Sequence, residues 1–373
     1  MSALPFIDLA AQRDRLGSRI DDAIAAVLDD GRYVMGPAVV ELEHRLAEWS
    51  DRTHALSCAS GTDALVMALM ALDVQPGDRV VVPDFTFVAT AEVVRLVGAT
   101  PVFADIDAAS YNLDPGSAAT AWQLEGPAPV GIIAVDLFGH PASHNALGSL
   151  AERLGAWMIV DGAQSFGATR DDHSTLAAGI ISTTSFFPAK PLGAYGDGGA
   201  VFTDDDEVAE RLRSIRLHGA GAAPYTHDRL GITGRLDTIQ AAILNVKLDI
   251  FADEIERRNT IARRYSDELS SVVKPPTTEP GVVPVWAQYT IEVDNRDGFR
   301  SSLNDDGVPT GIYYPYPLHT QGPYQTDPVV PDATPNTAAA ASRVVSLPMH
   351  PYLDEPTQDL IIDATVRALE TSR

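Results

Sequence analysis

Through its first two thirds, the chain alternates short apolar runs with stretches in which apolar residues recur every three or four positions. A short run suits a buried strand, and each periodic stretch suits a helix that crosses from one strand to the next. We predict strands at 55–58, 79–83, 101–105, 131–137, 156–161, 183–187 and 199–203, and helices at 61–72, 88–97, 145–154 and 207–216. Strands joined by crossover helices run parallel and are covered on both faces. The sequence therefore predicts an α/β fold with a mostly parallel seven-stranded sheet.

The pattern changes near residue 236, where a long helical stretch extends to residue 269. Beyond it we predict a Pro/Thr-rich loop at 274–284, strands at 285–293 and 309–314, and helices at 297–306 and 357–369. We therefore expect a large α/β domain over 1–250 and a smaller α+β domain over 251–373. The N-terminal helices, predicted near 13–28 and 39–49, are expected to pack on the small domain.

The charge of the chain excludes several classes of partner. Its 51 acidic and 27 basic residues give a formal net charge of -24, which disfavours nucleic acid and anionic membranes. No leader-like N-terminus or long apolar window is present, and a single cysteine, Cys58, fits a reducing compartment, so we expect a cytoplasmic protein. His140 and His144 have i,i+4 spacing, but Pro141 interrupts a helix there and no carboxylate completes a zinc motif. No metal is predicted.

A small Gly/Thr turn follows the first predicted strand. In Ala59-Ser60-Gly61-Thr62-Asp63, the first helical amides point outward, where the helix dipole favours a phosphate. The same residues also form an ordinary helix cap, and that alternative stays open for this motif by itself.

A carboxylate ends the predicted strand at 156–161. Asp161, followed by Gly162-Ala163-Gln164, lies where α/β sheets bind ligands. An ionised aspartate there suits a partner with a protonated nitrogen, such as the pyridinium of pyridoxal phosphate. The alternative is an aspartate that only caps the next turn.

The most specific segment is Ser185-Phe186-Phe187-Pro188-Ala189-Lys190-Pro191. A lysine between two prolines cannot lie in a regular helix or central strand, so Lys190 should project from a loop. Its apolar neighbours should lower its pKa toward the neutral amine that Schiff-base chemistry requires. Ser185 is close enough in sequence to contact a phosphate. Phe87, at another strand end, is available to stack on an aromatic ring, unless it is an ordinary core residue.

Taken together, these motifs resemble the DegT-type family of sugar aminotransferases, most closely the branch that aminates UDP-linked 3-oxo sugars. The resemblance spans nearly the whole chain and rests on Gly61-Thr62-Asp63-Ala64-Leu65, Asp161 with Gln164, the Lys190 segment, Arg216-Leu217-His218-Gly219 and residues 235–244. It implies a fold-type I pyridoxal phosphate enzyme that works as a homodimer with shared active sites.

The resemblance also implies a role for individual residues. Lys190 would form the internal aldimine, Asp161 would pair with the pyridine nitrogen, and Gln164 would lie near the ring hydroxyl. The phosphate would be held by Gly61, Thr62 and Ser185, with Phe87 against the ring. Family members use a partner-subunit asparagine for that phosphate where this chain has Thr233. Substrate contacts would come from Arg235 of the neighbouring subunit and from Tyr313, Tyr314 and His319, with Tyr313 replacing a histidine.

A lysine at position 190 favours transamination, since the sugar 3-dehydratase branch has histidine there. The expected reaction moves an amino group from an amino acid, with glutamate as the expected donor, to a UDP- or TDP-linked 3-keto sugar. Two alternatives stay open: an aminotransferase for a non-nucleotide ring ketone, such as a cyclitol, and a regulator that binds the cofactor without turnover.

Overall fold

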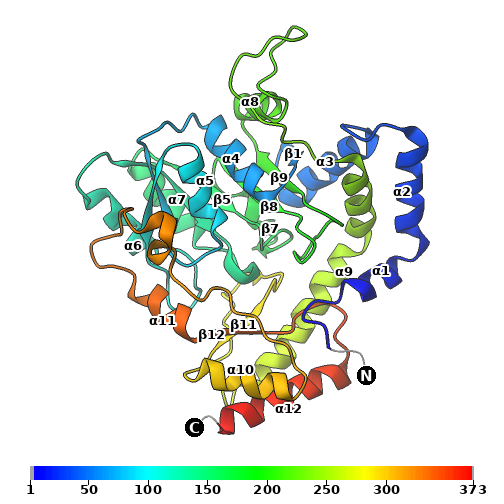
Figure 1. The fold of residues 1–373 in the computed structure, drawn as a ribbon, viewed down its shortest axis with the longest axis vertical. Helices are drawn as coiled ribbons and strands as arrows, with labels where there is room; N and C mark the ends of the chain where they lie inside the picture. Colours follow the sequence, from blue (N-terminus) through cyan, green and yellow to red (C-terminus); the bar gives the residue numbers. More distant parts are fainter. Residues whose placement is uncertain (1–3, 372–373) are drawn as a thin grey trace.

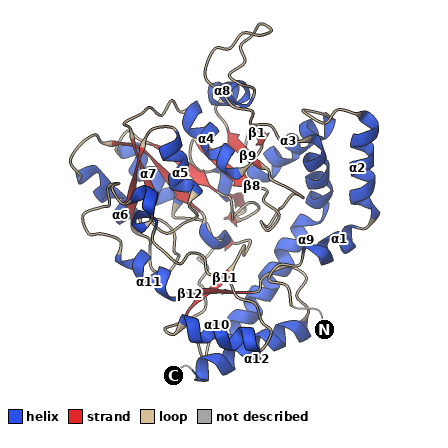
Figure 2. Ribbon diagram, in the orientation of Figure 1, coloured by secondary structure: helices blue, strands red, loops and turns tan. Residues whose placement is uncertain are grey.

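A seven-stranded sheet forms the centre of the computed structural model, which describes residues 4–371 (Figures 1 and 2). Its strands are β1 (His54–Cys58), β2 (Arg79–Pro83), β3 (Thr100–Ala104), β4 (Pro129–Val135), β5 (Trp157–Asp161), β8 (Ile181–Ser185) and β9 (Gly199–Thr203). They lie in the order β1-β9-β8-β5-β4-β2-β3. Only β9 runs against its neighbours, because the loop from β8 to β9 contains no crossover helix. The mostly parallel seven-stranded sheet is confirmed.

Helices cover both faces of this sheet. One face packs on α3 (Pro37–Ser50), α6 (Pro115–Thr120), α7 (His144–Arg153) and the first half of α9 (Thr238–Leu269). The other packs on α4 (Gly61–Ala71), α5 (Ala89–Leu96) and α8 (Asp206–Arg216). Along β2, Val81 enters the first of these cores, whereas Val80 and Val82 enter the second. Such alternation explains why the strands read as continuous apolar runs.

The second half of α9 leads into a smaller α+β unit, seen at the bottom of Figure 1. There, β11 (Tyr289–Glu292) pairs with β12 (Val344–Leu347), beside α10 (Arg296–Asp305) and α12 (Glu355–Thr371). Tyr265 and Leu269 of α9 enter the core of this unit. The expected division near residue 250 therefore lies inside one continuous helix.

The N-terminal helices α1 (Leu9–Leu16) and α2 (Ser18–Asp30) pack along α9. Leu16 and Ile20 share an apolar cluster with Ile243 and Ile250. The helix predicted at 13–28 is interrupted by Gly17, whose φ of 59° lies in the left-handed region. These helices thus contact mainly the half of α9 that covers the large sheet.

Two predictions for the C-terminal part were wrong in detail. Residues 309–314 form no strand, and only Gly311 makes a bridge, to Ser346. The place beside β11 is taken by β12, which follows α11 (Pro335–Arg343) without the Gly or Pro that marks most strand boundaries. The strand predicted at 285–293 is limited to β11, because Trp286 has a φ of 49° that no regular strand accepts.

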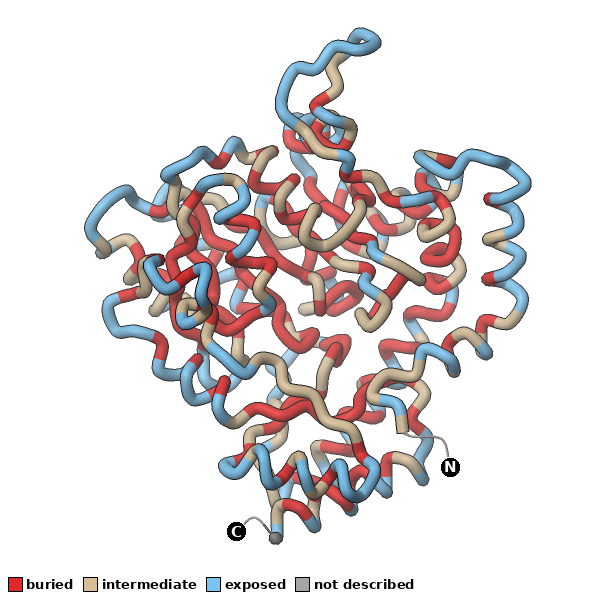
Figure 3. The backbone as a smooth tube through the Cα atoms, in the orientation of Figure 1, coloured by how far each residue is buried: buried red, intermediate tan, exposed pale blue. Residues whose placement is uncertain are grey.

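The remaining elements are short. A small sheet contains β6 (Thr169–Arg170), β7 (His173–Ser174) and β10 (Val282–Val283), and 3₁₀ turns occur at Ala121–Gln123, Leu137–Gly139, Thr175–Ala177, Leu318–Thr320 and Gly322–Tyr324. The segment after α8 leaves the body of the molecule as an exposed loop (Figure 3). Among the helices of residues 4–371, none is both long and apolar enough to cross a membrane.

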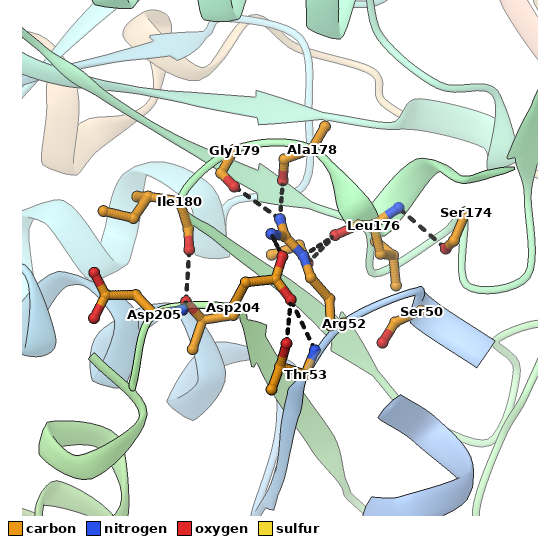
Figure 4. Close-up of polar contacts among 12 residues, drawn as sticks. Ser50, Arg52, Thr53, Ser174, Leu176, Ala178, Gly179, Ile180, Asp204 and Asp205 are labelled. Carbon is orange, nitrogen blue, oxygen red and sulfur yellow. Dashed lines mark hydrogen bonds and ion pairs between the residues drawn. The ribbon is translucent and has the colours of Figure 1, made fainter. Parts of the chain in front are cut away.

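A buried arginine forms hydrogen bonds with segments next to three strands, at the end of the sheet where the parallel strands begin (Figure 4). Arg52, just before β1, donates hydrogen bonds to the carbonyls of Leu176, Ala178 and Gly179, which precede β8. It also pairs with Asp204, which follows β9, at 2.7 Å. One side chain therefore joins the start of two strands to the end of a third.

We expect Arg52→Met to lower the free energy of unfolding by about 3 kcal/mol, because it leaves buried carbonyls and Asp204 without their donor. Chemical denaturation measures the change. Arg257→Met, which removes an arginine with a 51% exposed side chain and an i,i+4 partner, serves as the control and should unfold like the wild type. An Arg52→Met protein as stable as the wild type would contradict this role.

Candidate active site

Buried aspartates stand at the carboxyl ends of four neighbouring strands: Asp84, Asp105, Asp136 and Asp161. The carboxylates of the first three form hydrogen bonds with surrounding segments. Asp105, for instance, accepts the amides of two residues at the start of α11, and Asp136 accepts a hydrogen bond from Ser165 and contacts His144 at 2.7 Å. These contacts build the edge of the sheet at which α/β proteins bind ligands.

Asp161 differs from the other three because, among residues 4–371, its carboxylate contacts only one residue that is distant in sequence, through a hydroxyl group. Thr90 donates to its Oδ2 at 3.0 Å, and the amide of Ala163 donates to Oδ1 at 3.2 Å. Within residues 4–371 it forms no ion pair with Arg, Lys or His. Burial raises the pKa of Asp161, while these two donors and the charge of Lys190 oppose that shift. A buried carboxylate of this kind favours a ligand that brings a protonated nitrogen.

Lys190 lies in the loop from β8 to β9, as the flanking prolines predicted. Its amide donates to the carbonyl of Phe187 at 2.8 Å, which fixes a turn at the lysine itself. Burial lowers the pKa of Lys190 to about 8, with the carboxylate of Asp161 pulling in the opposite direction. The amine is therefore partly neutral, and nucleophilic, at neutral to mildly alkaline pH.

The Gly/Thr turn and Ser185 come together although they are far apart in sequence. Ser60 caps α4 by accepting the amide of Asp63 at 3.0 Å, and Gly61 and Thr62 begin the helix. The first amides of a helix have no partner inside it. A Cβ on Gly61 would lie 2.7 Å from Cβ of Ser185, so only glycine allows this approach. The helix start and the Ser185 hydroxyl thus form a cradle for an anion.

Gln164, Tyr314 and Phe87 form a third part of the site. The side-chain oxygen of Gln164 accepts the amide of Phe138 at 2.7 Å, and its nitrogen donates to the hydroxyl of Tyr314 at 3.3 Å. The ring of Phe87 lies 6.1 Å from that of Tyr314 and is 52% exposed, so it is no ordinary core residue. The structure therefore joins Tyr314 to the residues expected around the cofactor ring.

Among residues 4–371, no side-chain hydrogen bond or ion pair joins the other expected residues to this group. Thr233 is exposed and contacts His218 at 2.8 Å. Arg235 makes no hydrogen bond or ion pair with any residue between 4 and 371. The ring of Tyr313 lies 6.2 Å from that of Phe6 and 5.9 Å from that of Tyr314. His319 is fixed by the buried Asp84, at 2.6 Å between Nδ1 and Oδ2.

Sequence reasoning missed Thr90, Asp84 and Asp136 as parts of this edge. One signal could have found the aspartates: each follows an apolar run at the same position relative to its strand. Thr90 gives no such signal, since its contact with Asp161 spans 71 residues. The two histidines considered for a metal are engaged elsewhere, His144 with Asp136 and His140 edge-on to the ring of Trp286 at 4.4 Å.

Comparison with known proteins identifies the family. The model of the DegT/DnrJ/EryC1/StrS aminotransferase family matches residues 14–366. The chain belongs to this family. It is 46% identical over 365 residues to the UDP-2-acetamido-2-deoxy-3-oxo-D-glucuronate aminotransferase of Pseudomonas aeruginosa, covering 97% of this chain and 99% of that protein.

Solved structures of family members agree with the fold. A DegT/DnrJ/EryC1/StrS aminotransferase from Brucella abortus superposes with a TM-score of 0.96 at 49% identity, covering 97% of this chain and 98% of the other. DesV of S. venezuelae, solved with a ketimine intermediate, gives 0.94 at 37% identity and covers 99% of both chains. The fold-type I assignment is confirmed, and the protein is a pyridoxal phosphate-dependent aminotransferase. The cradle beside Gly61 and the carboxylate of Asp161 without a cation both fit that cofactor.

The lowered pKa of Lys190 can be measured directly in the cofactor-free protein. With only three lysines in the chain, amine labelling read by mass spectrometry resolves each one. We expect labelling of Lys190 to rise with a midpoint near pH 8, below the ordinary range for a lysine, because burial disfavours its ammonium form. Asp161→Asn should move the Lys190 midpoint lower still, because it removes the negative charge that favours the ammonium form. A Lys190 midpoint in the ordinary range for a lysine would contradict the burial argument.

Proposed function

We propose that the protein transfers an amino group from an amino acid, L-glutamate, to a UDP- or TDP-linked 3-keto sugar in aminosugar biosynthesis. The observation that carries the proposal is the pair formed by Lys190, an amine with a pKa of about 8, and Asp161, a buried carboxylate without an ion-pair partner. The P. aeruginosa relative is named for amination of a UDP-linked 3-oxo sugar, which supports the substrate class.

Each part of the site has a role in this proposal. Gly61, Thr62 and Ser185 hold the phosphate of pyridoxal phosphate, Asp161 pairs with the ring nitrogen, Gln164 lies at the ring hydroxyl, and Phe87 stacks on the ring. When bound, the cofactor supplies an electron sink that makes the C–H bond beside the donor nitrogen acidic. Lys190 would hold the cofactor through its Nζ. As a free amine it would take the proton from the donor carbon as a general base and then give it up as a general acid.

The substrate is an anion, and the protein has a net charge of -24, so binding requires local positive charge. Arg235 is a guanidinium without an ion-pair partner among the described residues, and it can bind a phosphate or carboxylate through two parallel hydrogen bonds. We place Tyr313, Tyr314 and His319 around the sugar. Asp84 holds His319 in one orientation for that contact.

We further propose a homodimer in which each chain completes the site of the other. Phe87 and Phe187 beside the cofactor site are each 52% exposed, and Tyr225 and Leu230 on the projecting loop are 99% and 86% exposed. Apolar exposure on this scale favours a protein partner. In the dimer, Thr233 would reach the cofactor phosphate and Arg235 the substrate of the neighbouring subunit. A cytoplasmic location stays a prediction from the sequence.

The first test is the visible spectrum of the purified protein before and after glutamate. We expect the wild type to show cofactor absorbance that glutamate bleaches. Lys190→Ala should lack the absorbance of the lysine-bound form and should not complete the half-reaction, because its proton-transfer amine is gone. A wild type without any cofactor absorbance, even after addition of pyridoxal phosphate, would overturn the assignment of the site. Cofactor binding without any reaction with amino acids would favour the regulator alternative.

The shared site can be tested by complementation. Arg235→Ala should raise the apparent KM for the keto sugar strongly, because it removes the cation that binds the anionic substrate. When Lys190→Ala and Arg235→Ala chains are co-expressed, a mixed dimer keeps one complete site if Arg235 acts across the interface. Random pairing would then restore roughly a quarter of the wild-type activity at low substrate. No gain over the separate variants would place Arg235 in the site of its own chain or outside it.

Competition identifies the nucleotide. Inhibition by UDP but not TDP, or the reverse, selects the base, whereas inhibition by neither would favour the non-nucleotide ring ketone.

A further inference from the structure

The loop that carries Lys190 is closed tightly on itself. At its base, the amide of Phe186 donates to the carbonyl of Gly198 at 2.8 Å, and the amide of Ala194 donates to the carbonyl of Phe186 at 2.7 Å. The two halves of the loop are in close contact, since a Cβ on Gly193 would lie 2.3 Å from the carbonyl oxygen of Pro188. The position of Lys190 at the far end therefore depends on what holds the returning residues, 193–195.

Those residues are held by one face of α9. Nζ of Lys247 donates to the carbonyl of Gly193 at 2.6 Å. Gln240 binds both backbone groups of Tyr195: its oxygen accepts the amide at 2.8 Å, and its nitrogen donates to the carbonyl at 3.4 Å. Gln240 and Lys247 are seven residues apart, which places them two turns apart on the same side of the helix.

Lys247 is an unusual residue for a purely packing role. It is 1% exposed, and it forms no ion pair with a carboxylate among residues 4–371. Its ammonium lies 4.2 Å from the centre of the Tyr195 ring, in the arrangement of a cation–π contact. Burial lowers the pKa of Lys247 to about 8, and Glu254 on the same helix opposes this shift. A buried amine is costly unless its hydrogen bonds are made.

The ring under this ammonium is itself fixed. Tyr195 packs against the apolar cluster that α1 and α2 form with α9, which contains Leu16, Ile20, Ile243 and Ile250. Lys247 is thus bound on one side to a backbone carbonyl of the loop and faces, on another, an aromatic ring of the same loop.

We propose that Lys247 is a positioning residue, which fixes the returning part of the loop so that the amine of Lys190 is presented correctly at Asp161. The inference rests on the proposed role of Lys190 and extends it to α9. Lys247 does not touch the reacting atoms and acts only through the carbonyl of Gly193 and the ring of Tyr195. A misplacement of about 1 Å at a reacting group can cost up to about a hundredfold in rate.

The test compares Lys247→Met with Lys274→Met in the cofactor-loaded protein. Lys247→Met keeps an unbranched chain of similar length but removes the donor, whereas Lys274→Met makes the same change at an exposed site far from the loop in sequence. Three quantities are measured per bound cofactor: the rate constant of the half-reaction at saturating glutamate, the Kd of glutamate, and the circular dichroism of the cofactor in the visible range. Thermal unfolding is recorded in parallel.

For Lys247→Met we expect the rate constant to fall about tenfold, the Kd of glutamate to stay within about twofold, and the visible dichroism to change at equal cofactor content. Lys274→Met should match the wild type in all three. If Lys247→Met does not fold, Lys247→Gln, whose amide is too short to reach the same carbonyl, should show the same pattern.

A rate constant and dichroism unchanged per bound cofactor would overturn the proposal, even if the protein unfolded at a lower temperature, because Lys247 would then act only in stability. A wild type that does not react with glutamate would instead overturn the proposed function. The two failures are therefore distinguishable.

Discussion

The buried carboxylate of Asp161 is the constraint on which the arrangement of the site depends. Asp161 ends β5 and lies opposite Thr183 of β8. Thr183 in turn precedes Ser185 by two residues and Lys190 by seven. This register brings acid, phosphate cradle and amine to one edge of the sheet. The carboxylates of three neighbouring aspartates bind nearby segments, whereas the carboxylate of Asp161 accepts hydrogen bonds, within residues 4–371, only from Thr90 and Ala163. The sheet thus provides one carboxylate whose charge is left for a ligand.

A single helix connects this edge to the rest of the molecule. The first half of α9 packs on the large sheet and binds the lysine loop through Gln240 and Lys247, while its second half enters the core of the small unit. The N-terminal helices pack on the same part of α9, and Tyr195 packs against the cluster that they form. A continuous helix is stiff enough to fix all of these contacts relative to one another. The lysine loop is therefore held by the architecture, and its own short hydrogen bonds are only part of its support.

The 27 basic residues of this chain are outnumbered by 51 acidic ones, and most of the arginines form ion pairs. Of the three lysines, Lys190 is the proposed cofactor lysine and Lys247 binds the backbone of its loop, which leaves Lys274 as the exposed one. Arg52 and Arg216 are buried in hydrogen-bonded pairs, with Asp204 and Glu43. Arg235 has no such partner among the described residues, which is consistent with a cation kept for an anionic substrate. In a protein with a net charge of -24, binding an anion requires local positive charge of this kind.

The sequence by itself determined the α/β class, all seven strands of the sheet and the loop position of Lys190, because the spacing of apolar residues and the positions of prolines and glycines act over a few residues. The cofactor followed from the resemblance of the sequence's motifs to the DegT-type family. The sequence did not reveal β12, the break at Gly17 or the irregular course of 309–314, where local signals were weak or misleading. Only the tertiary structure showed that Thr90 binds Asp161 across 71 residues and that Lys247 holds Gly193 across 54. Contacts of that range are set by how helices pack on the sheet, and no short motif records them.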